Sequence, residues 1–248
     1  MEEDRRTPRF AWVALFATVT VIFAWNLDAP FVHHQESNGT QYGFMARNVL
    51  KWGLPPSDAS GPTLDAYADP RAHDYVNRPP GVILAIAMTT AMFGDREASV
   101  RLVPTVFGLG ALAMFAMLAR RLLDGRGPLL ASALLAATPM FAYCSVSTIH
   151  QSPTLFFMLL MCVCYWRWRD TKKPVWLAAL VGAQLAGCWT DWPAYYAAGA
   201  LFLHDAISRR TLKSAMWIVV AANFAIFGSY LLYAGAARDV LLASAGDR

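Results

Sequence analysis

The sequence predicts an all-α membrane protein with about seven transmembrane helices and a long external first loop that carries juxtamembrane helices. Of its 248 residues, 56% are hydrophobic and only 15% are charged, and the mean hydropathy is +0.35. Such values are unusual for a soluble domain. The apolar residues occur in uncharged runs, several of which approach the roughly 20 helical residues that cross about 30 Å of hydrocarbon.

Seven apolar segments are candidates for the transmembrane helices. Residues 127–166 contain no Asp, Glu, Lys or Arg and are too long for one helix. We therefore divide them near Thr138-Pro139 and Ser152-Pro153 into two spans joined by a short turn. The other candidate spans are residues 10–27, 102–119, 174–190, 192–203 and 214–237.

The positive charges predict the orientation, because Lys and Arg are retained in cytoplasmic loops. Basic residues precede the first span and follow the second, fourth and sixth, whereas residues 138–152 and 190–196 hold none. The amino terminus is therefore expected in the cytoplasm and residues 28–101 outside. These basic flanks account for the pI near 9.0 and the net charge of +4, so no nucleic-acid partner is indicated. The basic set is Arg5, Arg6, Arg9, Arg120, Arg121, Arg126, Arg167, Arg169, Lys172, Lys173, Arg209, Arg210 and Lys213.

Two short segments of the external loop are expected to lie along the membrane surface. A crossing by the apolar residues 80–93 would invert every later loop and place the basic clusters outside. An apolar stretch of about 14 residues is more often interfacial or re-entrant than spanning. Residues 41–52 form the second segment, with an apolar helical face made of Tyr42, Met45, Val49 and Trp52.

The loop and its flanks contain four motifs in a specific order. The acidic segment His33-His34-Gln35-Glu36-Ser37-Asn38-Gly39 follows the first span, and Ala46-Arg47-Asn48 with Gly53 comes next. Arg78-Pro79-Pro80 and the segment from Gly94 to Arg101-Leu102-Val103-Pro104 complete the order. In this order and spacing they resemble the first external loop of C-type glycosyltransferases, which include bacterial aminoarabinose transferases and protein O-mannosyltransferases.

The resemblance implies an enzyme that moves a hexosyl or pentosyl group from a polyprenyl-phosphate donor to an acceptor hydroxyl, with inversion. The acceptor would be a glycan, lipid or protein at the external face of a bacterial inner membrane. Residues 1–248 would form one transmembrane glycosyltransferase module, with residues 28–101 as its external catalytic loop. Because the family usually continues with more spans, we expect this chain to be truncated at its carboxyl terminus.

The family places its general base in the first loop, on a carboxylate just after span one. Glu36 is the first candidate by this resemblance, although Gln35 would occupy the equivalent position if the motif is offset by one residue. Asp28, at the end of the span, is the runner-up. Asp191, the only acid in either short external turn, could complete the site from across the bundle. Each of these acids could also be an ordinary solvated or interfacial residue.

The candidates for binding the donor phosphate are Arg78, Arg47, His150 and Gln151. Arg78 stands beside two prolines, and a held guanidinium is a forked donor suited to phosphate. Its alternative role is to anchor the loop to lipid headgroups. His150 and Gln151 belong to the turn before the fourth span, where relatives often have an Asp near the position of Gln151. The chain departs from the family there.

The adjacent residues His33 and His34 are candidate ligands for a divalent metal ion, together with Glu36 and with His73 or Asp74. Imidazole and carboxylate groups suit such ions. Hydrogen bonding to the substrate would explain the same residues, and no other cofactor is indicated.

A membrane transporter or flippase component is the alternative function. Its external acids and histidines would coordinate a substrate or an ion. This function predicts ionisable residues within the spans and helices broken at the bilayer midplane. The predicted spans contain almost no ionisable residues, which favours the transferase.

Overall fold

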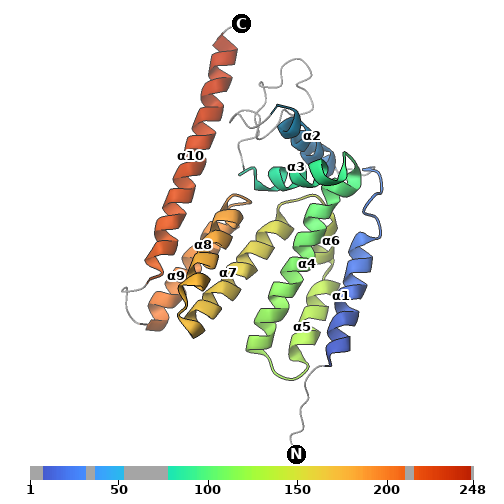
Figure 1. Cartoon of the computed structure of the whole chain (residues 1–248), viewed down its shortest axis with the longest axis vertical. Coiled ribbons are helices and arrows are strands. Elements are labelled where there is room, and N and C mark those ends of the chain that lie inside the picture. Colours follow the sequence, from blue (N-terminus) through green and yellow to red (C-terminus); the bar gives the residue numbers. More distant parts are fainter. Residues whose placement is uncertain (1–7, 32–36, 53–77, 210–214, 247–248) are drawn as a thin grey trace, which may run out of the picture.

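The computed structural model describes residues 8–31, 37–52, 78–209 and 215–246, and every regular element in these residues is a helix. The helices pack as a bundle, with α3 lying across one end of it (Figure 1). The predicted all-α class is therefore confirmed. In chain order the helices are α1 (Arg9–Ala24), α2 (Ser37–Trp52), α3 (Gly81–Phe93), α4 (Glu97–Leu122), α5 (Gly127–Ala137), α6 (Pro139–Val146), α7 (Gln151–Thr171), α8 (Pro174–Cys188), α9 (Pro193–Arg209) and α10 (Trp217–Gly246).

Proline marks the start of several of these helices. Pro139, Pro174 and Pro193 are the first residues of α6, α8 and α9, and Pro128 is the second residue of α5. A proline at the start of a helix costs no helical hydrogen bond, because the first N–H groups of a helix have no partner within the helix. The division expected at Thr138-Pro139 coincides with the start of α6, and Ser152-Pro153 lie in the first turn of α7. The segment between these divisions was expected to be a turn, but it contains α6, which meets α5 at a bend of 65°.

Apolar clusters of the described residues hold the bundle together. Met161, Leu180 and Val219 belong to a cluster that joins α7, α8, α9 and α10. Another cluster joins α1 to α4 and α6 around Leu112 and Phe141. Helices α4 and α7 pack along each other and connect these two halves.

A separate cluster attaches the two short helices of the first loop to the start of α4. Tyr42, Met45 and Val49, three residues of the predicted apolar face, are buried there against Ile86 of α3 and Val103 of α4. The two helices expected within residues 41–52 and 80–93 are therefore present as α2 and α3. Their contact with a membrane surface stays a prediction.

The predicted count of seven spans is not confirmed. Among the described helices, Glu97–Leu122 and Trp217–Gly235 are long and apolar enough to cross a membrane, and the bent pair of α5 and α6 would make a third span. Helices α1 and α8 are apolar but have only 16 and 15 residues. At 1.5 Å per residue they reach about 24 Å or less, short of the roughly 30 Å of hydrocarbon. A helix or bent pair nevertheless occupies each predicted segment.

Candidate functional site

Segments that lie far apart in the chain meet where α3 begins. Arg78 precedes α3, His150 precedes α7, and Asp191 lies in the turn between α8 and α9. The guanidinium nitrogen Nη1 of Arg78 is 3.3 Å from His150 Nδ1 and 3.7 Å from Asp191 Oδ2. The hydroxyl oxygen of Tyr42, on α2, is 3.2 Å from the same His150 nitrogen. We call these four residues the Arg78 cluster.

Because Gly81 has no side chain, the start of α3 can approach the backbone of Trp189 closely. The N–H of Gly81 donates a hydrogen bond of 2.8 Å to the carbonyl oxygen of Trp189, and a Cβ on Gly81 would lie 2.4 Å from that oxygen. The bond docks the start of α3 onto the turn that carries Asp191. Pro79 and Pro80 are buried and restrict the backbone before Gly81. The Arg-Pro-Pro-Gly sequence thus brings Arg78 to Asp191.

Asp191 is held in place by its own turn. It is 9% exposed, its N–H donates to the carbonyl oxygen of Gly187 at 3.0 Å, and its Oδ1 accepts the N–H of Trp192 at 2.9 Å. The other carboxylate oxygen is the one nearest Arg78. Its distance of 3.7 Å is an ion-pair distance and too long for a hydrogen bond. The arginine compensates the charge of a carboxylate that has lost most of its water.

His150 is only 1% exposed, and its ring serves as an acceptor. A guanidinium can donate hydrogen bonds but cannot accept them, so Nδ1 carries the lone pair and we assign the ring proton to Nε2. Burial and then the charge of Arg78 lower the pKa of His150 to about 4, with Asp191 opposing the shift. The ring meets Tyr42 edge-on, with centroids 5.1 Å apart. The carbonyl oxygen of His150 accepts the N–H and the hydroxyl of Thr154, which fixes the turn.

Acid is expected to destabilise the protein through His150. The folded-state pKa is lowered from 6.5 to about 4, so the neutral ring contributes stability that is complete above pH 6.5 and is lost as the pH falls towards 4. The loss is on the order of 3 kcal/mol. Thermal unfolding in detergent across this range would measure it. His150→Gln cannot titrate and should show a flatter profile, whereas identical profiles would assign the acid sensitivity to other groups.

Part of the Arg78 guanidinium group is available to a ligand. The side chain is 38% exposed, and its contacts with the described residues use the single nitrogen Nη1. A guanidinium carries five N–H donors in one plane. The remaining donors can therefore bind an anion while His150 and Asp191 keep the group in position.

Several predicted residues lie outside the described part of the chain. Glu36, His33 and His34 do so, together with Gln35, His73 and Asp74. Their roles as base and metal ligands stay predictions. Within the described residues, no group of three His, Cys, Asp or Glu side chains could hold a metal ion.

Asp28 lies in the exposed turn after α1, and Arg101 of α4 holds the backbone around it. Arg101 is 5% exposed, and its guanidinium donates to the carbonyl oxygens of Leu27 at 3.3 Å and Pro30 at 3.4 Å and also to that of Ala29. The start of the first loop is therefore tied to α4. The sequence singled out Arg101 only as part of a motif and did not predict this contact.

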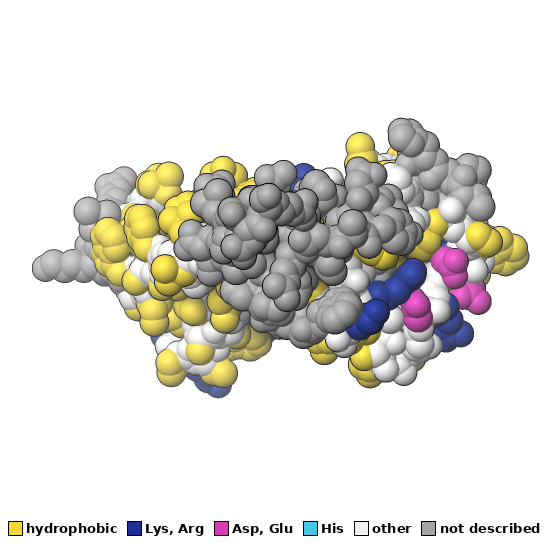
Figure 2. Space-filling model, turned by 90° about the horizontal axis from the view of Figure 1, so that it is seen from above, with side chains coloured by type: hydrophobic (Ala, Val, Ile, Leu, Met, Phe, Trp, Pro, Cys, Tyr) yellow, Lys and Arg dark blue, Asp and Glu magenta, His cyan; other side chains and the backbone are white. Residues whose placement is uncertain are grey.

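Arg47 and Gln151 are exposed at the same end of the bundle. Arg47 forms an ion pair of 3.0 Å with Asp95, which follows α3, and both side chains are more than half exposed. Gln151 is the first residue of α7 and follows His150 directly. Figure 2 views the molecule from this end and shows basic and acidic side chains beside one another at one edge. Phosphate binding by Arg47 and Gln151 stays a prediction.

Tyr42 is a residue of the cluster that the sequence did not predict as functional. It was expected only on the apolar face of residues 41–52, and it is indeed buried, at 6% exposure. A buried tyrosine hydroxyl usually finds a hydrogen-bond partner. The burial of Tyr42 therefore indicates that its hydroxyl has a hydrogen-bond partner, but it does not identify His150 as that partner.

Comparisons with known proteins agree with this fold. No curated protein matches the chain. The crystal structure of ArnT from Cupriavidus metallidurans in the apo state matches with 19% sequence identity and a TM-score of 0.64, over 91% of this chain and 42% of that one. The chain thus spans less than half the length of that protein, and the likeness shows the fold.

The family model described as dolichyl-phosphate-mannose-protein mannosyltransferase matches residues 77–233. This match covers more than half of the chain and includes Arg78, His150 and Asp191. It agrees with the resemblance that the loop motifs carry and with the apolar helices of a membrane protein. The chain therefore belongs to the dolichyl-phosphate-mannose-protein mannosyltransferase family, whose members are integral membrane glycosyltransferases of the GT-C fold.

Proposed function

We propose that this chain carries part of the active site of a glycosyltransferase that moves a sugar from a polyprenyl phosphate to an acceptor hydroxyl on a glycan, lipid or protein. The observation that carries the proposal is the Arg78 cluster, in which a partly exposed arginine is held between a neutral histidine and a carboxylate. A lipid-linked donor has its tail in the bilayer and its phosphate at the surface. A cation at the end of an apolar bundle suits that phosphate.

In the proposed reaction, the oxygen of the acceptor hydroxyl attacks the anomeric carbon while the bond from that carbon to the phosphate oxygen breaks. The electron pair of this bond leaves with the phosphate, and the proton of the hydroxyl passes to a base, for which we propose Glu36. Attack from the side opposite the phosphate inverts the anomeric configuration. Arg78 stabilises the negative charge that develops on the phosphate.

Asp191 and His150 act through Arg78 in this proposal. Asp191 supplies a fixed negative charge 3.7 Å from the guanidinium, and His150 supplies a fixed acceptor at 3.3 Å. Together they restrict the arginine to one orientation before the donor arrives. Preorganised donors of this kind need little rearrangement as charge develops in the transition state.

We also propose that the end of the bundle with the Arg78 cluster faces the outside of a bacterial inner membrane, and that the amino terminus lies in the cytoplasm. Arginines near the carboxyl ends of α4 and α7 gather at the opposite end, among them Arg120, Arg121, Arg167 and Arg169. Positive residues are retained on the cytoplasmic side. The donor would then be used on the external face.

The bend between α5 and α6 is a feature that a transporter could also use. Transporters place substrate and ion ligands at such breaks. Residues 127–146 contain no Asp, Glu, Lys, Arg or His, so this break lacks the ionisable groups that would coordinate an ion. The transferase is therefore the better supported function.

Arg78→Lys tests the contact with the donor. A lysine keeps the charge but cannot form the two parallel hydrogen bonds of a guanidinium, so binding of a polyprenyl-phosphate sugar should weaken by about 10- to 100-fold. Photocrosslinking or calorimetry with a panel of such donors would measure the affinity. Arg96→Lys is the matched control, since Arg96 is an exposed arginine at the same end. Unchanged binding in Arg78→Lys would make Arg78 a headgroup anchor.

A further inference from the structure

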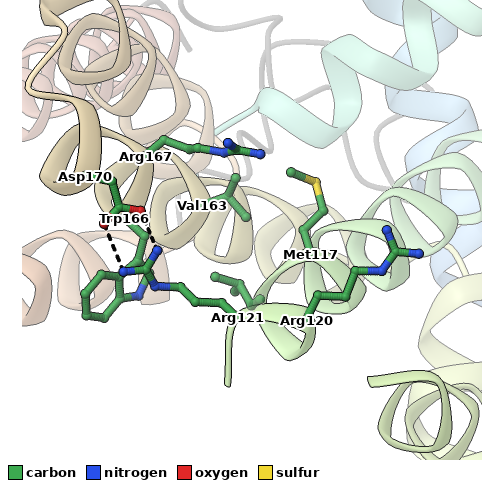
Figure 3. A pocket seen from close by; sticks show the side chains of 8 residues that line it. Met117, Arg120, Arg121, Val163, Trp166, Arg167 and Asp170 are labelled. Atoms are coloured by element: carbon green, nitrogen blue, oxygen red, sulfur yellow. Dashed lines mark hydrogen bonds and ion pairs between the residues drawn. The ribbon is translucent and has the colours of Figure 1, made fainter. Parts of the chain in front are cut away.

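A pocket lies at the other end of the bundle, far from the Arg78 cluster in the fold. It has a volume of about 580 Å³ and opens between the last turns of α4 and α7. Figure 3 shows its side chains, with arginines projecting from both helices around an apolar centre. The lining residues are Met117, Leu118, Arg120, Arg121, Val163, Trp166, Arg167 and Asp170.

The pocket carries an excess of positive charge. Arg121 is paired with Asp170, with one of its two contacts at 3.0 Å, and its guanidinium lies 4.4 Å from the centre of the Trp166 ring. Arg120 and Arg167 form no ion pair with any residue that the structure describes. Three guanidinium groups against one carboxylate give the lining a net charge of +2, and the hydrogen bond from Arg121, helped by the charge of Arg167, lowers the pKa of Asp170.

The two arginines of the lining that form no ion pair with a described residue, Arg120 and Arg167, lie against tryptophans of neighbouring helices. The Arg120 guanidinium lies 4.2 Å from the centre of the Trp12 ring on α1, and that of Arg167 lies 5.9 Å from the Trp176 ring on α8. Stacking on an indole face restricts a guanidinium and leaves its N–H edge available. Tryptophan is also enriched at membrane surfaces. In the orientation proposed above, this end of the bundle faces the cytoplasm, and the two groups would lie near the lipid headgroups of that side.

The apolar part of the lining indicates the kind of anion. Met117, Leu118 and Val163 form an apolar wall beside the arginines. An inorganic anion has no apolar surface to bury against this wall. Basic pockets between helices on the cytoplasmic side are suited to anionic lipid headgroups. We propose that this pocket binds an anionic phospholipid, with Arg120 and Arg167 on its phosphate and an acyl chain along the apolar wall.

The test compares lipids that differ in headgroup charge. The chain in neutral detergent is mixed with phosphatidylglycerol, with phosphatidylcholine or with inorganic phosphate, and bound lipid is measured by native mass spectrometry together with the unfolding temperature. Phosphatidylglycerol should bind and stabilise, and the other two should not. Replacing both Arg120→Gln and Arg167→Gln should weaken binding by about 30-fold, the effect expected of two surface charges near an anionic membrane.

Two further variants make the outcome specific. Arg126→Gln removes an exposed arginine of the same end that does not line the pocket, and it should leave binding unchanged. Arg120→Lys with Arg167→Lys keeps both charges and should keep the preference for phosphatidylglycerol, which also covers the case in which the glutamine variant fails to fold. Equal binding of phosphatidylcholine, equal stabilisation by inorganic phosphate, or an equal loss in Arg126→Gln would overturn the proposal.

Discussion

Glu36→Gln is expected to lower the rate of sugar transfer by about 10²- to 10⁴-fold, the usual cost of losing a general base. An amide can accept a hydrogen bond but cannot take a proton at neutral pH, so the fold and donor binding should be retained. Release of polyprenyl phosphate from a polyprenyl-phosphate sugar, measured in membrane vesicles, would report the rate. Glu36→Asp should keep some activity if the shorter side chain still reaches the hydroxyl.

Asp28→Asn is the matched control for this experiment. Asp28 lies in the same loop, and Arg101 holds the carbonyl groups beside it, so its replacement tests an acid that only shapes the loop. Asp191→Asn should act differently, because it removes the negative charge that pairs with the guanidinium of Arg78. Full activity in Glu36→Gln together with loss of activity in Asp28→Asn would move the base to Asp28.

Gly81→Ala is expected to have the next largest effect. The new Cβ would lie 2.4 Å from the carbonyl oxygen of Trp189, so the start of α3 must move away from the turn that carries Asp191. Overpacking of this kind costs about 1–3 kcal/mol of folding free energy. A displacement of about 1 Å at Arg78 would lower transfer on the order of 10²-fold. Unfolding midpoints and transfer rates of the same preparation separate the two effects.

Gly182→Ala is the control for the glycine experiment. Gly182 is in α8, and a Cβ there would meet no atom within 4 Å. Alanine is also the better helix former, so both stability and transfer should be kept or improved. If Gly81→Ala behaved like Gly182→Ala, the close approach at Trp189 would not position Arg78.

Local signals in the sequence predicted the helices well. Residues 41–52 and 80–93 lie almost entirely in α2 and α3, Pro139 is the first residue of α6, and Pro153 lies in the first turn of α7. These features depend on hydrophobic spacing and on the missing N–H of proline, both of which act over a few residues. The loop motifs likewise predicted the family, which the match over residues 77–233 confirms.

The span count shows where local signals were insufficient. Hydrophobic runs located all seven segments, yet in the described residues only two helices, or three with the bent pair, meet the length and composition of a span. Helix length depends on where caps and turns end each element. Helix α1, for example, ends at Ala24 and not at the predicted residue 27.

The amino-acid pattern alone was enough to predict the all-α class, the approximate positions of the helices and the family. The folded chain was needed to show that Arg78 and Tyr42 both contact His150, because these contacts join residues 72 and 108 positions apart. Such contacts depend on how α2, α3, α7 and α8 pack, and no local pattern encodes that packing. The close fit of Gly81 to Trp189 is the physical reason that the start of α3 can lie against the turn between α8 and α9.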